Sequence, residues 1–399
     1  MTKIHSIQKK LLKYINEDQN IISVINFLFG LQFITPYLAL YMQNQLQSLS
    51  QVALVFALQS ASMVIFEIPS GLSADILGRK KSLIIAGLLQ LISLITLYVS
   101  SNIVGFFLFA IFQGVITGFT LKTSESYLYE ALVKKKEVND YKKHYINIQG
   151  MWSVGATVSS LSSGILAFFN IKSLIIASIA VSSFIPYLAL FLTDIKGQKI
   201  KKKKNYFKTL TKILNHELFT KSITAFVLFN IFYLGIFNES LKLKSILFNY
   251  KTISIELIGI FTALFYFMTT IGLRASHYLS KKLSDYKVFL IGLSGFITST
   301  VFSMFTDGIV SVLIFSLNGF FFSINNPIIS HLLNKNISNY HRATTISVFR
   351  LLSNFAQLVI GIWISIATVY IEITDVYLMM ALLLITLLFF FKRMFVYLK

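Results

Sequence analysis

The sequence predicts an all-α integral membrane protein with twelve transmembrane helices in two pseudo-symmetric six-helix bundles. Hydrophobic residues make up 55% of the 399 residues, and the mean hydropathy is +0.71. Only 13% of the residues are charged, whereas soluble domains carry about a quarter, so the chain lacks the polar surface of a soluble protein. Since a membrane-crossing helix needs about 20 apolar residues, the chain is long enough for twelve of them.

Six apolar runs of spanning length predict the helices of the first half. The first run follows the basic residues 1–20, the third follows Arg79–Lys81, and the fifth follows the basic stretch 134–143. A narrow break at Asn170–Lys172 separates the fifth from the sixth. The six runs lie near 21–42, 51–71, 82–99, 103–128, 146–169 and 173–193.

Six further runs predict the helices of the second half. The seventh follows the long basic segment 195–221, and the break at Thr306–Gly308 separates the ninth from the tenth. These runs lie near 222–239, 254–273, 287–306, 308–332, 345–369 and 374–391. A membrane-spanning helix tolerates proline because neighbouring helices and water satisfy the freed backbone carbonyl. Kinks are therefore expected at the four prolines inside the runs: Pro36, Pro69, Pro186 and Pro327.

The positive charges fall unevenly between the loops on the two sides of the membrane. With the N-terminus inside, the inner segments hold 32 of the 36 Lys and Arg residues, and the other four are Lys172, Lys242, Lys244 and Lys251. Cytoplasmic loops carry the excess of Lys and Arg, so both termini are predicted to be cytoplasmic. The net charge of +20 therefore indicates topology and not a nucleic-acid partner.

The chain divides into two halves of similar length. We expect an N-terminal bundle at 1–194, a basic cytoplasmic linker at 195–221 and a C-terminal bundle at 222–399. Residues 206–219 of the linker are either an amphipathic helix on the membrane surface or a solvated tether. A degenerate repeat supports the division into two related halves. The segment Gly71–Lys81 stands at the end of the second run, and the related segment Gly272–Lys282 stands at the end of the eighth.

Residues 71–83 resemble the signature loop of the major facilitator superfamily, G-x-L-a-D-r-x-G-r-k-x-x-l. The matching residues are Gly71, Ala74, Asp75, Gly78, Arg79, Lys80 and Leu83. The resemblance implies a latch on the cytoplasmic side, in which Asp75 contacts the start of the eleventh helix. The residues expected at this gate are Gly71, Asp75, Gly78, Arg79, Lys80 and Arg342. Alternatively, the basic residues of the loop serve only as topology charges.

Three further segments are similar to a bacterial branch of this superfamily that is rich in drug exporters. They are the E-I-P-S-G stretch at Glu67–Gly71, the segment Ser124–Leu132 and the segment Leu333–Ser347. One departure concerns proton coupling, because drug–proton antiporters of the superfamily usually carry Arg four residues before Gly114. Here Ala110 occupies that position.

Three ionisable residues inside the runs are the candidates for coupling, because a charge within a membrane span indicates a functional site. They are Glu67 in the second run and Lys122 and Glu125 in the fourth. Each carboxylate would load and release a proton near neutral pH, with Lys122 as the counter-charge. Two alternatives are a permanent Glu–Lys pair that braces the two helices and a position at the membrane interface.

Polar and aromatic residues near the middle of the runs are expected to line a substrate cavity between the halves. They are Asn26, Gln32, Gln113, Asn230, Phe321, Asn325, Asn326 and Asn354. Each polar residue could instead form hydrogen bonds between helices.

The predicted function is secondary active transport by alternating access, with proton-coupled export of a small amphipathic molecule. The expected location is the inner membrane of a bacterium, and the expected partners are the substrate, protons and membrane lipid, with the protein as a monomer. No cofactor, metal, nucleic-acid or enzymatic role is expected, since the sequence contains no phosphate-binding loop or metal-ligand spacing. Two alternatives are a specialist transporter of a metabolite, peptide or siderophore and a non-transporting membrane sensor.

Overall fold

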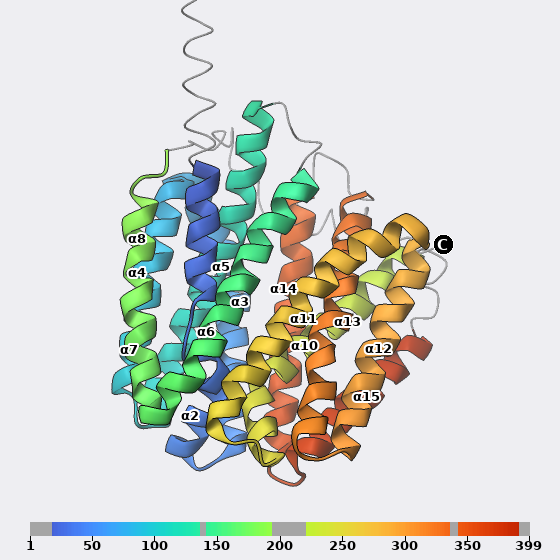
Figure 1. Ribbon diagram of the computed structural model, residues 1–399. Helices are drawn as coiled ribbons and strands as arrows, with labels where there is room; N and C mark the ends of the chain where they lie inside the picture. The colour runs from blue at the N-terminus through green and yellow to red at the C-terminus, as the bar shows by residue number, and fades with distance from the viewer. Residues whose placement is uncertain (1–17, 136–140, 194–220, 336–341, 391–399) are drawn as a thin grey trace, which may run out of the picture.

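The computed structural model describes residues 18–135, 141–193, 221–335 and 342–390. Within these ranges the regular structure consists entirely of helices, which stand side by side in one bundle (Figure 1). The described segment that ends at 193 and the helix that begins at 221, on the two sides of the predicted linker, meet one end of the molecule, named here the linker face (Figure 1). The opposite end, named the far face, carries the short connections at 47–48, 100–102, 251–254 and 306–307. The predicted linker lies outside the described residues.

Among the described residues, twelve helical segments are long and apolar enough to cross a membrane. This number confirms the sequence prediction. The segments are Asp18–Leu46, Leu49–Glu67, Arg79–Val99, Ile103–Thr120, Gly150–Phe169, Ile171–Ala189, Ala225–Tyr250, Ile255–Lys282, Asp285–Phe305, Gly308–Ile329, Val348–Ala367 and Ile373–Phe390.

The first six spans contain two interrupted helices. The first span consists of a helix at 18–30, the 3-10 helix η1 (Thr35–Tyr37) and α2 (Leu38–Leu46), and the sixth consists of α7 (Ile171–Ser182) and α8 (Phe184–Ala189). Pro36 lies in η1 and Pro186 lies in α8, as expected from a residue that lacks an N–H donor. The remaining helices are α3 (Leu49–Leu77), α4 (Arg79–Val99), α5 (Ile103–Lys135) and α6 (Tyr141–Phe169).

The last six spans are single helices. The tenth predicted run, 308–332, is close to the bounds of α13 (Gly308–Lys335). Pro327 lies inside this continuous helix. The six are α10 (Lys221–Tyr250), α11 (Ile255–Lys282), α12 (Asp285–Phe305), α13 (Gly308–Lys335), α14 (Arg342–Ala367) and α15 (Ile373–Phe390).

The seventh helix is longer than the sequence predicts. The predicted run ends at residue 239, whereas α10 continues to Tyr250. Glu239, Lys242 and Lys244 interrupt the apolar pattern, but all three are largely buried inside the protein. Lys242 and Lys244 therefore belong to a helix long enough to span a membrane, so their assignment to a loop was wrong.

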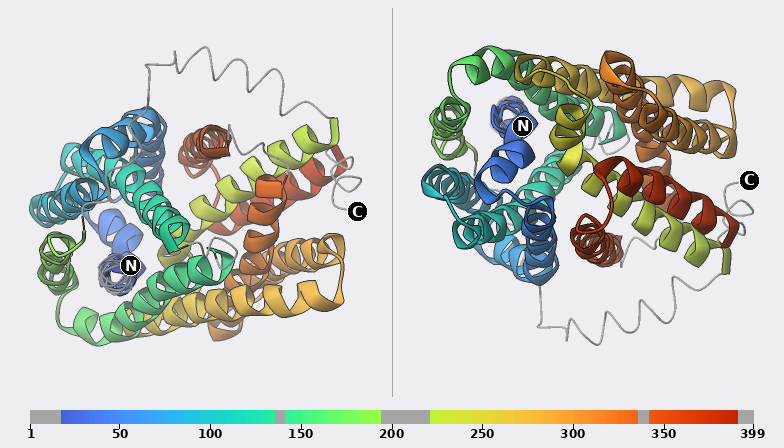
Figure 2. Two further views of the ribbon diagram at one scale, coloured as in Figure 1. Left: turned by 90° about the horizontal axis from the view of Figure 1, so that it is seen from above. Right: turned by 90° about the horizontal axis from the view of Figure 1, so that it is seen from below.

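The two halves lie beside each other and meet along two helix pairs. The helices of residues 18–193 gather on one side and those of residues 221–390 on the other (Figure 2). Across the boundary α3 packs on α14, and α6 packs on α11. The halves thus share an extended contact formed by helices from equivalent places in each half.

Gly259 of α11 allows the close approach of α6. A Cβ atom at Gly259 would lie 2.6 Å from the Ser160 carbonyl oxygen and 2.8 Å from the Gly164 nitrogen. Both neighbours are backbone atoms of α6, so neither can rotate away.

We expect Gly259→Ala to force the α6–α11 pair apart and to destabilise the protein by about 1–3 kcal/mol. The measurement is thermal unfolding of the purified protein in detergent. Gly150→Ala is the matched control, because nothing lies within 4 Å of a Cβ atom at that helical glycine. Equal unfolding midpoints for the two variants would contradict this account of the helix contact.

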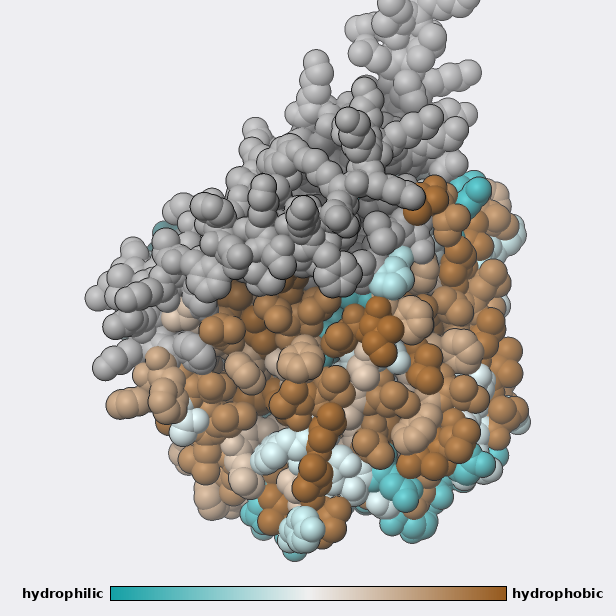
Figure 3. All heavy atoms as spheres, turned by 180° about the vertical axis from the view of Figure 1, so that it is seen from behind, coloured by the Kyte–Doolittle hydropathy of each residue, from teal (hydrophilic) through white to brown (hydrophobic). Residues whose placement is uncertain are grey.

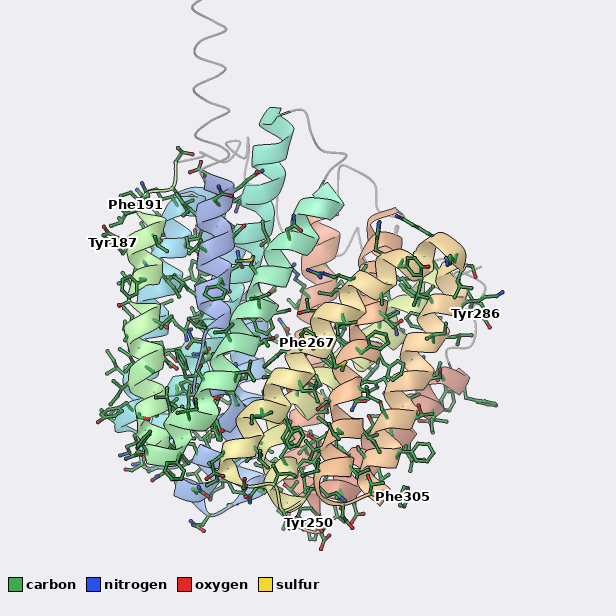
Figure 4. All side chains as sticks on the ribbon, viewed as in Figure 1. Tyr187, Phe191, Tyr250, Phe267, Tyr286 and Phe305 are labelled. Atoms are coloured by element: carbon green, nitrogen blue, oxygen red, sulfur yellow. The ribbon has the colours of Figure 1, made fainter. Side chains whose placement is uncertain are left out.

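The lateral surface of the bundle is apolar. Figure 3 shows mostly hydrophobic residues over the described part of the back face, with hydrophilic residues gathered at its lower end. Exposed aromatic side chains mark both ends of the bundle: Tyr187 and Phe191 lie toward the linker face and Tyr250 and Phe305 toward the far face (Figure 4). Aromatic residues are enriched at the two membrane–water interfaces, so this surface fits a bilayer between the two faces.

Candidate functional site

Hydrogen bonds join the two halves close to the far face. Ser365 Oγ of α14 donates to the Ser50 carbonyl oxygen of α3 at 2.8 Å, and the two hydroxyl oxygens are 3.2 Å apart. Tyr37 Oη donates to the Ile255 carbonyl oxygen at 2.8 Å and accepts from the Gly259 N–H at 3.0 Å. The serine bonds tie α3 to α14, and the tyrosine bonds tie η1, which also contacts α6, to the far-face end of α11. The far face is therefore closed in this structure.

A buried ion pair lies deeper between the halves. Lys242 Nζ donates to Glu239 Oε1 at 2.6 Å within α10. Ser60 of α3 joins the pair from the other half, because its hydroxyl donates to Glu239 Oε1 at 3.2 Å and accepts from Lys242 Nζ at 3.0 Å. Glu239 is only 1% exposed. The ion pair itself lies within α10, whereas its hydrogen bonds to Ser60 cross the boundary between the two halves. Relative movement of the halves would break these bonds to Ser60.

Lys244 brings a second positive charge to the same region. Its side chain is only 3% exposed, and Nζ lies 5.5 Å from the centre of the Tyr266 ring of α11. Lys244 Nζ also donates to the Leu241 carbonyl oxygen, at a long 3.4 Å. Tyr266 in turn meets Trp152 of α6 edge to face, with ring centres 5.7 Å apart. We name Ser60, Glu239, Lys242, Lys244 and Tyr266 the interface cluster.

The interface cluster reaches the middle of the membrane. Ser60, Glu239 and Tyr266 each lie eleven residues from the far-face end of their helices, at Leu49, Tyr250 and Ile255. At 1.5 Å per residue this is about 16 Å, or roughly half of a hydrocarbon core of about 30 Å. Lys242 and Lys244 lie eight and six residues from Tyr250, or about 12 and 9 Å, so the two cations of the cluster lie between mid-membrane and the far face.

Two glutamines expected at the cavity, Gln32 and Gln113, belong to a hydrogen-bond chain inside the first half. Gln32 Nε2 donates to Ser182 Oγ at 3.0 Å, and Gln90 Nε2 donates to Gln32 Oε1 at 3.3 Å. Gln113 Nε2 donates to Ser93 Oγ at 3.0 Å. These contacts join the first, third, fourth and sixth spans. Both glutamines thus form hydrogen bonds between helices, which was the alternative to a cavity-lining role. A lining role for either residue stays a prediction.

In the second half, Asn325 and Phe321 of α13 lie against α12. The Asn325 amide is 3.2 Å from both the Phe289 carbonyl oxygen and the Leu293 N–H, and it satisfies both when its nitrogen faces the carbonyl. A Cβ atom at Gly295 of α12 would collide with the Phe321 ring. Both side chains therefore fill the helix pair α12–α13.

The remaining predicted lining residues have mixed surroundings. Asn230 is fully buried, and its Nδ2 donates to the Phe226 carbonyl oxygen at 2.7 Å, while Oδ1 has no hydrogen-bond partner among the described residues. Asn26 Nδ2 donates to the Ile22 carbonyl oxygen at 2.9 Å within its own helix. Asn354 Oδ1 accepts from Gln357 Nε2 at 3.4 Å, and Asn326 is half-buried. An unpartnered amide oxygen makes Asn230 the member of this set best suited to meet a ligand or water.

Of the predicted coupling residues, Glu67 lies buried in α3 with 4% exposure. Lys122 and Glu125 lie on α5, and their side chains are outside the described residues. The coupling role of all three residues stays a prediction.

The predicted gate residues lie where α3 meets α4. Gly78 has a φ of +90°, which an L side chain rarely adopts, so the turn requires the glycine of the motif. Arg79 is buried and Lys80 is half-buried at the start of α4. The environment of Gly71 and the side chains of Asp75 and Arg342 are outside the described residues, so the latch itself stays a prediction.

The family follows from comparison with known proteins. Residues 21–361 match the family model described as Major Facilitator Superfamily. The chain belongs to the major facilitator superfamily. It is therefore a multi-pass membrane protein of a transporter family, as the motif at 71–83 indicates.

Solved structures of transporters share the fold of this superfamily member. A point mutant of the nucleoside transporter NupG has a TM-score of 0.78 at 16% identity, covering 94% of this chain and 99% of that chain. A D-xylose–proton symporter has a TM-score of 0.73 at 16% identity, with 94% and 97% covered. The inward-open xylose transporter XylE from E. coli has a TM-score of 0.72 at 16% identity, with 95% and 96% covered.

A curated relative covers a smaller part of the chain. The uncharacterized MFS-type transporter MJ1560 of Methanocaldococcus jannaschii is 24% identical over 152 residues. The match spans 38% of this chain and 38% of that protein. This match agrees with membership of the superfamily, and the name of the relative indicates no substrate.

The sequence analysis missed the interface cluster. Glu239 was placed at the outer end of the seventh run, and Lys242 and Lys244 were counted as outer-loop charges. One signal was present: the apolar residues Leu243 and Ile246–Phe248 continue beyond the charges, which indicates a longer helix.

Proposed function

We propose that the chain is a secondary transporter that works by alternating access and exports a small amphipathic molecule in exchange for protons. The observation that carries the proposal is the closed far face next to a charged cluster buried at mid-membrane between the halves. A site between two bundles is exposed to one side at a time when the bundles rock against each other. Export rests on the similarity of Glu67–Gly71 and two further segments to the exporter-rich branch.

We place the transporter in a bacterial inner membrane with the linker face in the cytoplasm. The uneven distribution of Lys and Arg supports this orientation. With Lys242 and Lys244 assigned to a span, the connections at the far face retain Lys172 and Lys251. In this orientation the structure has its outer side closed.

A second candidate function is the transport of one polar metabolite, in either direction. The charged interface cluster favours it, because a charged mid-membrane site suits a substrate with a complementary polar group. Proteoliposomes loaded with a panel of anionic and cationic fluorescent dyes separate the candidates. A polyspecific exporter moves several dyes and a specialist moves none, while a sensor shows no flux of any substrate.

Proton coupling is expected to depend on Glu67 and Glu125. Glu67→Gln and Glu125→Gln each remove a group that can release a proton, so each variant should lose transport driven by an imposed pH gradient while it remains folded. Dye flux in proteoliposomes and size-exclusion chromatography provide the two readouts. Glu256→Gln, at an exposed carboxylate on α11, is the control. Full activity in both the Glu67→Gln and the Glu125→Gln variants would contradict the proposed coupling.

A further inference from the structure

We propose that Lys244 binds an anionic group of the transported molecule, so that the substrate is an amphipathic organic anion such as a carboxylate or a phosphate ester. This inference rests on the proposed transport function. It assigns the charge of the substrate and the residue that recognises it.

The first argument is the charge balance of the interface cluster. Glu239 is the single carboxylate of the cluster, and Lys242 occupies it at 2.6 Å. Among the described residues no carboxylate lies within 4.0 Å of Lys244 Nζ, whose neighbours are the Leu241 carbonyl oxygen and the Tyr266 ring. The cluster therefore holds two basic groups and one acidic group, so it carries one excess positive charge whenever Lys244 is protonated.

The second argument is the cost of that imbalance. An unpaired charge in a membrane span is expensive unless it finds a partner. A carbonyl oxygen at 3.4 Å and an aromatic ring 5.5 Å away provide weaker compensation than a carboxylate at hydrogen-bond distance. A substrate anion at Lys244 would restore neutrality, and the charged group of the substrate would gain a partner away from water.

The third argument concerns the apolar part of the substrate. The rings of Tyr266 and Trp152 meet edge to face and connect α11 of one half with α6 of the other. Trp152 is half-buried, so the protein leaves part of its surface uncovered. An aromatic pair beside a lysine fits a molecule with a flat or aliphatic body and one anionic end.

The test uses the absence of cysteine from the chain. Trp152→Cys is introduced alone and together with Lys244→Met or Lys244→Arg in the full-length protein in detergent. The labelling rates are measured with a negatively charged sulfonatoethyl and a positively charged trimethylammonioethyl methanethiosulfonate. If Trp152→Cys does not fold, Tyr266→Cys is the second reporter.

We expect the negative reagent to be favoured when Lys244 is present, and this preference to fall by about tenfold in Lys244→Met and to persist in Lys244→Arg. Naphthalene-2-carboxylate should slow labelling only in the proteins that keep the cation, whereas naphthalene-2-carboxamide should have no effect. An unchanged preference in Lys244→Met, or equal protection by the amide, would overturn the proposal.

Dye flux in proteoliposomes separates this proposal from the proposed function. Absence of dye flux together with the expected labelling pattern would contradict polyspecific export and leave the anion site standing. Flux in the wild-type protein together with a Lys244-independent labelling pattern would contradict the anion site alone.

Discussion

Lys242→Met is expected to destabilise the protein by about 3–5 kcal/mol, because it leaves Glu239 buried without its cation. Glu239 is 1% exposed and retains only the Ser60 hydroxyl as a partner in this variant. The thermal unfolding midpoint of the purified protein in detergent measures the loss. Lys172→Met is the control, since that lysine is exposed at the far face and contributes little to stability.

The double variant Glu239→Gln/Lys242→Met distinguishes lost pairing from lost packing. Removing both charges leaves no buried ion, so the double variant should recover most of the stability that the Lys242→Met variant loses. A double variant that is less stable than Lys242→Met would contradict the account, because it would mean that the two side chains act independently.

The fold could be predicted from the sequence because each membrane span depends on the residues of its own segment. A membrane span needs only a run of apolar residues of sufficient length, and the position of each run can be read without knowing its neighbours. The breaks at Asn170–Lys172 and Thr306–Gly308 were correct, since α6 ends at Phe169 and α13 begins at Gly308. The motif at 71–83 then identified the superfamily.

The interface cluster could not be predicted because its partners are distant in the chain. Glu239 and Ser60 are 179 residues apart, and nothing in the local pattern of either segment connects them. A hydropathy reading treats Glu239, Lys242 and Lys244 as the end of a span. The structure buries them because Glu239 and Lys242 pair within α10, Tyr266 of the neighbouring α11 lies beside Lys244, and the packing of the two halves adds Ser60.

The same limit affected the mid-span polar residues. Gln32 and Gln113 have the residue type and depth of a cavity lining, and a sequence cannot distinguish that role from a hydrogen bond to a neighbouring helix. Their partners Ser182 and Ser93 were not identifiable from spacing. The same holds for Asn325, whose amide faces α12.

A reversible cross-link between α3 and α14 is expected to stop transport completely. Ser50 Oγ and Ser365 Oγ are 3.2 Å apart at the far face, so cysteines at both positions should form a disulfide under mild oxidation. The bond would hold the far face closed, and alternating access requires that face to open in each cycle. The chain contains no other cysteine, so the cross-link is specific.

The most direct test of alternating access is therefore dye flux through Ser50→Cys/Ser365→Cys in proteoliposomes, measured oxidised and then reduced, with a dye that the wild-type protein moves. Each single-cysteine variant is the control for oxidation itself. The account predicts that flux falls to the background of empty liposomes when the disulfide forms and returns when it is reduced. Undiminished flux through the fully cross-linked protein would contradict it.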